Sequence, residues 1–202
     1  NRGLAGGYNS NITRMIIDEG FTKENTVVYA VGKKGRELLE RKGYEIKADY
    51  SEAINDPIYK DAKEICDDVL SAFADGEVGE IYLAYTVFKN TVVHEPQLIR
   101  LLPVEADDAA HETDGSEALM TYEPSEEEAL DMIIPKYVCS LVYGALIESV
   151  ASENGARMQA MDSATSNAEE MISTLSLKYN RARQASITQE LTEIIAGANA
   201  IE

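Results

Sequence analysis

The chain has 202 residues, 45% of them apolar, and a formal net charge of −18 at pH 7. This length is sufficient for one good core with an extension. The strong negative charge argues against a nucleic-acid-binding protein and against a polybasic membrane anchor. We find no run of about 18 apolar residues, so we expect no membrane span and no direct membrane insertion.

The first hundred residues alternate between short strands and helices. The predicted elements, in chain order, are a helix over 8–19, a strand over 26–31, a helix over 33–42 that ends at Gly43, a strand over 44–48 and a helix from Pro57 to about Gly76. This order predicts a three-layer, Rossmann-like α/β domain whose first strand lies upstream of residue 1. The chain is therefore expected to begin in the middle of an element.

An antiparallel hairpin is predicted to close this domain. Its strands span 80–88 and 91–102, and its two-residue link, Lys89-Asn90, contains an asparagine that tolerates positive φ. Residues 104–131 follow, with eleven acids and no Lys or Arg. We interpret most of this segment as a solvated loop, with an edge strand over 119–123. A metal site is the alternative, although the acids lack the spacing of a calcium loop.

The rest of the chain is predicted to be helical. Ser125 and Glu128 form a capping box, so a short connecting helix is expected over 125–134. Pro135 then interrupts or restarts the helix, and a long helix of about 100 Å follows over 135–202. Two helices could instead meet at 152–155. We expect one continuous helix, because a single internal glycine costs only about 1 kcal/mol. The predicted domains are thus 1–124, 125–134 and 135–202.

Two rows on the long helix recur every seven residues, as in the seam of a two-helix coiled coil. One row holds Met158, Thr165, Ile172 and Tyr179, and the other holds Met161, Ala168, Leu175 and Ala182. A further row, Ile187, Ile194 and Ile201, is out of phase with them. The sequence contains no second long amphipathic helix. The mate must therefore come from another chain or from residues upstream. The polar run 180–190 is either a solvated surface or a face that a surrounding protein contacts.

No group of residues favours catalysis. The turn Gly3–Gly7 lacks the spacing of a phosphate-binding loop, so nucleotide binding there is only a minor alternative. His94 and His111 stand apart from any nucleophile or metal-ligand pattern. Cys66 and Cys139 lie in apolar surroundings and are predicted to be buried thiols. We therefore expect no catalytic residue, no cofactor and no metal ion.

Several segments resemble the gamma subunit of the rotary ATP synthase, the central stalk of that enzyme. They are Arg2-Gly-Leu-Ala-Gly-Gly-Tyr-Asn-Ser-Asn11, Tyr85-Thr-Val-Phe-Lys-Asn90 with Glu95-Pro96, 141–153 with 156–158 and 160–162, and Tyr179-Asn-Arg-Ala-Arg-Gln-Ala-Ser-Ile-Thr-Gln-Glu190. The last segment is the most specific. The chain departs from the family in lacking the N-terminal helix, and in having Asn1 where Asp is usual and Ala5 where Cys is common.

The resemblance implies a non-catalytic rotor subunit that couples ion-driven rotation to ATP synthesis or hydrolysis. Its long helix would pair with the absent N-terminal helix as an antiparallel coiled coil. The seam would contain Arg157, Met158, Met161, Ala168, Ile172, Leu175, Tyr179 and Ala182. The residues that would contact a beta subunit are Arg183, Gln184, Thr188 and Glu193.

The partners implied by the resemblance are the ring of alpha and beta subunits, the epsilon subunit and the membrane ion-translocating ring. The implied location is peripheral, on the cytoplasmic face of the plasma membrane or on the matrix or stromal side in an organelle. Two rival interpretations are a generic coiled-coil scaffold with an α/β head and, less favoured, a small nucleotide-binding α/β enzyme that uses Gly3 to Gly7.

Overall fold

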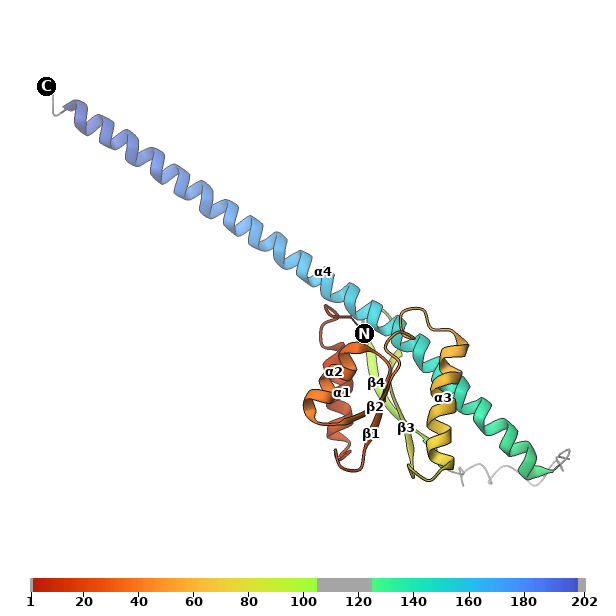
Figure 1. Cartoon of the computed structure of the whole chain (residues 1–202). Coiled ribbons are helices and arrows are strands. Elements are labelled where there is room, and N and C mark those ends of the chain that lie inside the picture. The colour runs from red at the N-terminus through yellow and green to blue at the C-terminus, as the bar shows by residue number, and fades with distance from the viewer. Residues whose placement is uncertain (1, 105–124, 200–202) are drawn as a thin grey trace, which may run out of the picture. The chain divides into compact units, whose positions relative to one another are not determined.

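The structure is a computed structural model that describes residues 2–104 and 125–199 (Figure 1). The predicted edge strand over 119–123, His111 and Ile201 lie outside the described residues. The chain divides into two compact units, Asn1–Gln159 and Ala160–Glu202. Each unit is described by itself below.

The first unit combines short strands with helices, as the sequence predicts. Its elements are α1 (Tyr8–Asp18), β1 (Val27–Ala30), α2 (Lys33–Lys42), β2 (Glu45–Asp49), α3 (Tyr59–Ala74), β3 (Ile81–Phe88), β4 (His94–Leu102) and the first part of α4 (Glu126–Asn199). The remainder of α4 forms the second unit. The mixed α/β class and the long C-terminal helix are therefore confirmed.

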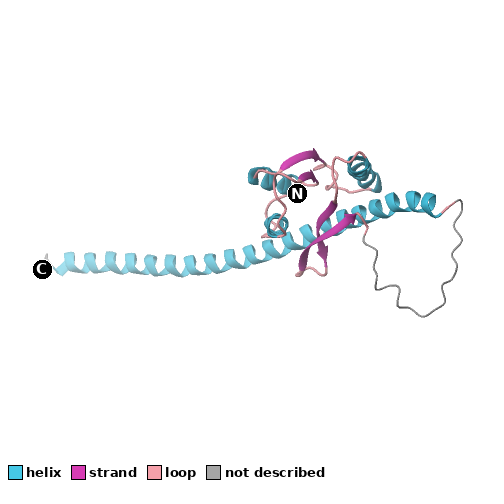
Figure 2. Cartoon of the chain, turned by 90° about the horizontal axis from the view of Figure 1, so that it is seen from below, coloured by secondary structure: helices cyan, strands magenta, loops and turns pink. Residues whose placement is uncertain are grey.

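The described strands pair in two short sheets (Figure 2). β1 and β2 are parallel, and α2 connects them as the crossover helix. Gly43 ends α2 in a left-handed conformation with φ of 90°, where its N–H donates to the Glu40 carbonyl. A residue without Cβ adopts this conformation at no steric cost, which explains why the predicted end of the helix is correct.

β3 and β4 form the predicted antiparallel hairpin, with Phe88 opposite His94 at its end. The link between the strands is longer than predicted, because it spans residues 89–93 instead of 89–90. The Asn90 side-chain oxygen accepts hydrogen bonds from the N–H groups of Val92 and Val93, at 2.9 and 2.8 Å. This side chain therefore takes the place of ladder hydrogen bonds and ends the strand pairing early.

α4 begins where the capping signal predicts. The Glu128 N–H donates to the Ser125 hydroxyl at 3.2 Å, and the helix starts at Glu126. Pro135 lies inside the helix and does not interrupt it, contrary to the sequence-based expectation. Proline is tolerated here only at the loss of one backbone hydrogen bond. The helix also continues through Gly155, as predicted.

The main core of the first unit lies between α3, the β3–β4 hairpin and α4. Its buried members are Ile54, Ala62, Ile65, Cys66, Ile81, Leu101, Leu102, Val138, Cys139, Val142 and Leu146. Cys66 and Cys139 are free buried thiols, which confirms the prediction for both. Burial raises the pKa of the Cys66 thiol to about 12, so this residue packs as a small apolar side chain.

One helix of the described part of the chain, residues 128–197 of α4, is long and apolar enough to meet the criteria for a membrane span. Its most apolar 18-residue window has a mean hydropathy of 1.5. Such a window can contain charged residues, so it does not contradict the expectation that the sequence has no run of about 18 apolar residues. One such helix is weak evidence for a membrane span, because core helices of soluble proteins meet the same length and composition criteria.

Candidate functional surface on the long helix

The predicted seam residues of the second unit are all exposed on α4. Ile172, Leu175 and Tyr179 are 64%, 63% and 68% exposed. Met161, Ala168 and Ala182 are exposed as well. At about 100° per residue, these positions lie on one side of the helix. Exposed apolar side chains that recur at alternating spacings of three and four residues on one side of a helix are typical of a coiled-coil seam.

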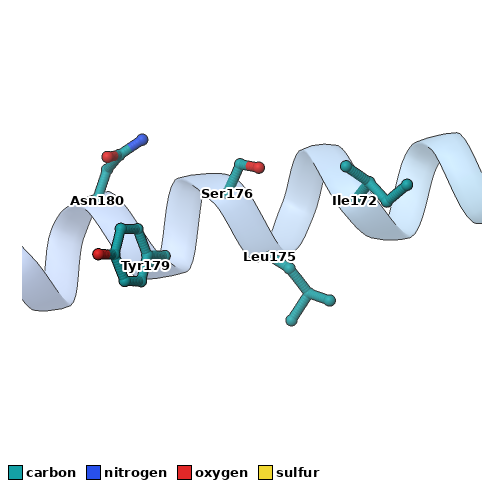
Figure 3. A pocket seen from close by; sticks show the side chains of 5 residues that line it. All are labelled: Ile172, Leu175, Ser176, Tyr179 and Asn180. Atoms are coloured by element: carbon teal, nitrogen blue, oxygen red, sulfur yellow. The ribbon is translucent and has the colours of Figure 1, made fainter.

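A shallow hollow of about 360 Å³ lies on this row (Figure 3). It is lined by Ile172, Leu175, Ser176, Tyr179 and Asn180. In coiled coils, each apolar side chain of one helix inserts into a hole formed by four residues of the facing helix. The hollow has the composition and the spacing of such a hole.

The predicted beta-subunit contacts are also exposed, but they do not share one face. Gln184 and Thr188 lie about 40° apart around the helix axis, whereas Glu193 lies about 180° from Gln184. In the described part of the chain, Arg183 and Gln184 make no hydrogen bond or ion pair. Glu193 accepts a hydrogen bond from the Gln189 side chain at 2.9 Å. The structure therefore places Gln184 and Thr188 together and separates Glu193 from them.

Arg157 and Met158 lie at the end of the first unit, and only Met158 presents a free apolar surface. Its side chain is 57% exposed. The Arg157 guanidinium forms an ion pair with Glu153 and donates to the Asn154 side-chain oxygen at 2.9 Å. Arg157 therefore holds its own helix turn, which is a role the sequence did not predict.

The sequence also did not predict the role of residues 149–155 of α4, here termed the anchor segment. Glu153 is only 6% exposed, and its carboxylate accepts a hydrogen bond from the Arg2 backbone N–H at 2.8 Å. Burial raises the pKa of Glu153, whereas the hydrogen bonds from the Arg2 N–H and the Arg157 guanidinium favour the charged form, and the net result is a lowered pKa. Glu153 is thus a buried, charged acceptor that holds the glycine-rich turn against α4.

Two further hydrogen bonds join the anchor segment to other elements. The fully buried Ser152 hydroxyl donates to the Thr86 carbonyl of β3 at 3.2 Å. Pro96, which lies opposite Thr86 in the hairpin, has no N–H to donate, so Ser152 supplies a partner for this carbonyl. On α1, the Tyr8 hydroxyl donates to the Ser149 carbonyl at 3.0 Å. Burial raises the pKa of Tyr8, which keeps the hydroxyl protonated as a donor.

Gly155 completes the anchor segment by close packing. A Cβ at this position would lie 2.9 Å from His94 Cε1 and 3.3 Å from Phe88 Cε2. The His94 and Phe88 rings stack with their centroids 6.0 Å apart. The sequence does contain a signal for this segment. The buried stripe Val138, Val142 and Leu146 continues with helical spacing into Ser149 and Glu153, where polar side chains replace apolar ones.

The glycine-rich turn, which the nucleotide-binding interpretation would use as a ligand site, is thus held by groups of the protein itself. The Arg2 N–H donates to Glu153, the Asn9 side-chain amide donates to the Arg2 carbonyl at 3.2 Å, and Ala5 is 2% exposed. Among the described residues, no group of three or more His, Cys, Asp or Glu side chains is arranged to hold a metal ion. A mixed α/β unit with a long helix that exposes a heptad row defines the class: a subunit built for assembly through a helix.

Comparisons with known proteins identify the family. A family model described as ATP synthase matches residues 1–201. The ATP synthase gamma chain of Lachnoclostridium phytofermentans is 68% identical over all of this chain and 71% of that relative. The sodium-ion-specific gamma chain of Acetobacterium woodii is 43% identical, over 99% of this chain and 72% of that relative. This chain belongs to the ATP synthase gamma-subunit family, and its role is that of the central-stalk rotor subunit.

Solved structures agree with this assignment. A chain in the structure of the central stalk and c-ring of the Tetrahymena thermophila mitochondrial ATP synthase is 25% identical, with a TM-score of 0.62 over 82% of this chain and 72% of that chain. A chain of the Euglena gracilis mitochondrial enzyme shares the fold, at 20% identity and a TM-score of 0.71 over 100% of this chain and 70% of that chain. The chain is thus a component of a peripheral, membrane-associated complex.

Proposed function

We propose that α4 is the axle on which a ring of alpha and beta subunits is centred. Rotation of this axle would couple ion movement through a membrane ring to ATP synthesis or hydrolysis on the beta subunits. The epsilon subunit and the ion-translocating ring would contact the α/β unit. The complex would lie on the cytoplasmic face of the plasma membrane, or on the matrix or stromal side in an organelle, without insertion of this chain into the bilayer.

One observation carries this proposal: the exposed row Ile172, Leu175 and Tyr179 on the second unit. Covering apolar area yields about 25 cal/mol per Å², so leaving such a row in water is unfavourable. An antiparallel partner helix, of the kind that the family resemblance implies, would cover it. The resulting two-helix shaft would be stiffer than a single helix, as transmission of torque requires.

The polar segment beyond the seam would provide the contact with a beta subunit. Arg183 presents a planar guanidinium with several N–H donors, and Gln184 presents an amide. Thr188 lies near Gln184 on the helix. Glu193 faces the opposite side, so it would meet a different part of the ring. Contacts that differ around the axle would favour different states of the three beta subunits at each angle.

This chain would take no part in the chemistry of ATP. The glycine-rich turn packs against Glu153, so its Arg2 N–H already has a carboxylate partner. No nucleotide or metal ion is needed to explain this turn. We therefore propose that ATP binding and hydrolysis occur on the beta subunits alone, and that the chain acts only through its contacts.

Reconstitution of the full-length subunit with alpha and beta subunits tests the proposal. We expect rotation and ATP hydrolysis to depend on this subunit. In the Arg183→Ala, Gln184→Ala variant, the hydrolysis rate should fall about tenfold, because loss of a hydrogen bond to a charged group costs about 1.5 kcal/mol or more.

The matched control is Arg181→Ala, which removes an equal charge from the same exposed stretch of α4. It should retain most of the activity. The scaffold rival expects the double variant to behave like the control. If the ring hydrolyses ATP equally well with and without the subunit, the proposed coupling role is wrong.

A further inference from the structure

The anchor segment differs from the rest of α4 in how many elements hold it. Within residues 149–155, the helix touches α1 through Ser149, β3 through Ser152 and the glycine-rich turn through Glu153. Gly155 adds contact with the hairpin residues Phe88 and His94. Four separate parts of the first unit therefore meet α4 within about two turns.

The positions of these contacts around the helix determine what they can resist. With 3.6 residues per turn, Gly155, Ser152, Ser149 and Glu153 span on the order of 160° of the circumference. A helix held along one narrow line can roll about its axis. A helix held over nearly half of its circumference cannot roll without breaking several of these contacts.

The chemistry of the contacts is directional. Ser152 is fully buried and Glu153 is 6% exposed, so water cannot replace their partners without opening the unit. The Glu153 carboxylate is fixed from two sides, by the Arg2 N–H and by the Arg157 guanidinium. On the amino-terminal side of this segment, the buried surface of α4 is formed by apolar residues such as Val142 and Leu146, whose packing has little directional preference.

We propose that the anchor segment is the torsional clamp of the subunit, where torque passes between α4 and the α/β unit. This inference rests on the proposed rotor function. Because α4 is one continuous helix from Glu126 to Asn199, torque applied to its carboxy-terminal half must be resisted where the helix is held. Ser152, Glu153 and Gly155 are positioning residues in this device, since they act through other elements and touch no substrate.

The test uses the full-length subunit in the complete, membrane-embedded ATP synthase. Two quantities are measured in the same vesicles: the rate of ATP hydrolysis and the number of ions pumped per ATP hydrolysed. The Ser152→Ala, Glu153→Ala double variant should hydrolyse ATP within twofold of the unmodified rate, but pump at least threefold fewer ions per ATP. The stall torque of single molecules should fall in parallel.

Two controls separate the clamp from general damage. The Ser163→Ala, Glu170→Ala double variant removes the same side-chain types from the exposed second unit, and it should keep normal pumping per ATP. Glu153→Gln retains an oxygen that can accept a hydrogen bond from the Arg2 N–H. With Ser152 unchanged, this single variant should therefore retain most of the ions pumped per ATP. Thermal unfolding of each isolated variant establishes that the unit is folded at the assay temperature.

The outcomes are distinguishable. If the folded Ser152→Ala, Glu153→Ala variant pumps as many ions per ATP as the unmodified enzyme, the clamp is wrong and the rotor function stands. If the unmodified subunit itself supports neither rotation nor pumping, the rotor function is wrong and the clamp with it. Should the double variant fail to fold, Gly155→Ala, which opens the hairpin contact alone, is subject to the same measurement and the same criterion.

Discussion

At position 155, a hydrogen atom is the only side chain that the surroundings admit. A Cβ would approach His94 Cε1 to 2.9 Å, and the stacked Phe88 ring prevents His94 from yielding easily. Overpacking of this kind destabilises a protein by about 1–3 kcal/mol. The better helix propensity of alanine offsets about 1 kcal/mol of that loss. Gly155→Ala should therefore lower the free energy of unfolding by about 1 kcal/mol, as measured by urea denaturation.

Gly144 on the same helix is the matched control. A Cβ there would meet nothing within 4 Å. Gly144→Ala should therefore leave the protein as stable or raise its stability by up to about 1 kcal/mol, through helix propensity alone. Equal effects of the two substitutions would show that the contact between α4 and the hairpin is not tight.

The buried Glu153 gives the first unit a specific sensitivity to acid. Its pKa is lowered in the folded state, so the carboxylate contributes stability above the usual glutamate pKa of about 4.3. That contribution is lost as the pH falls through the lowered folded-state pKa. Glu153→Gln should cost about 1 kcal/mol at pH 7 and progressively less as the pH falls through the lowered folded-state pKa of Glu153, because both side chains are then neutral.

Acid denaturation monitored by circular dichroism measures this difference. Glu170→Gln on the exposed part of α4 is the control, and it should shift neither the stability at pH 7 nor its pH dependence. A constant difference between Glu153→Gln and the wild type from pH 7 to pH 3 would exclude the carboxylate as the cause.

At the scale of elements, the sequence predicts what local chemistry decides. α2 ends at the glycine that its pattern indicates, and α4 starts at the capping serine. The hairpin pairs as expected, but its turn is longer because the Asn90 side chain competes for the N–H groups that a two-residue link would use. The hydrophobic pattern fixes which faces are buried, and it does not determine where a side chain will end a ladder.

The anchor segment shows what a sequence pattern misses. Ser152 and Glu153 each have a partner that lies more than sixty residues away in the chain, on β3 and in the glycine-rich turn. Neither of these distant partners is a side chain with a recognisable motif, since both are backbone groups. The coiled-coil row, in contrast, follows from periodicity alone, and the structure places its members on one side of α4. Whether a second helix covers that row remains a prediction.

The element-scale prediction concerns that row. In the full-length subunit, Leu175→Ala should lower the free energy of unfolding by about 2 kcal/mol, the lower end of the cost of truncating a buried leucine. Leu177→Ala is the control, because Leu177 lies about 160° from Leu175 around the helix and is similarly exposed, at 58%. It should cost no more than about 0.5 kcal/mol. Equal costs in urea denaturation would contradict the predicted seam.

At the scale of the whole molecule, the two units are stabilised by different means. The first unit has a core that includes Val138, Cys139 and Val142 of α4. The second unit, in the described residues, is a single helix whose side chains are exposed. An isolated helix depends on propensity alone and is marginally stable in water, whereas a packed helix is held by tertiary contacts. Opening of backbone hydrogen bonds should therefore cost much more free energy in the first unit.

Hydrogen exchange on the 202-residue chain by itself tests this difference. Amides of residues 138–146 should exchange at least about 100-fold more slowly than amides of residues 165–195, because only the former require the core to open. In the full-length subunit, a helix paired with the row at Ile172 and Leu175 should slow exchange in residues 165–195. The difference in exchange rate between these amides and those of residues 138–146 should therefore be smaller. If residues 165–195 are as strongly protected in the 202-residue chain as residues 138–146, the second unit is stable without a partner, and the argument that its exposed row must be covered fails.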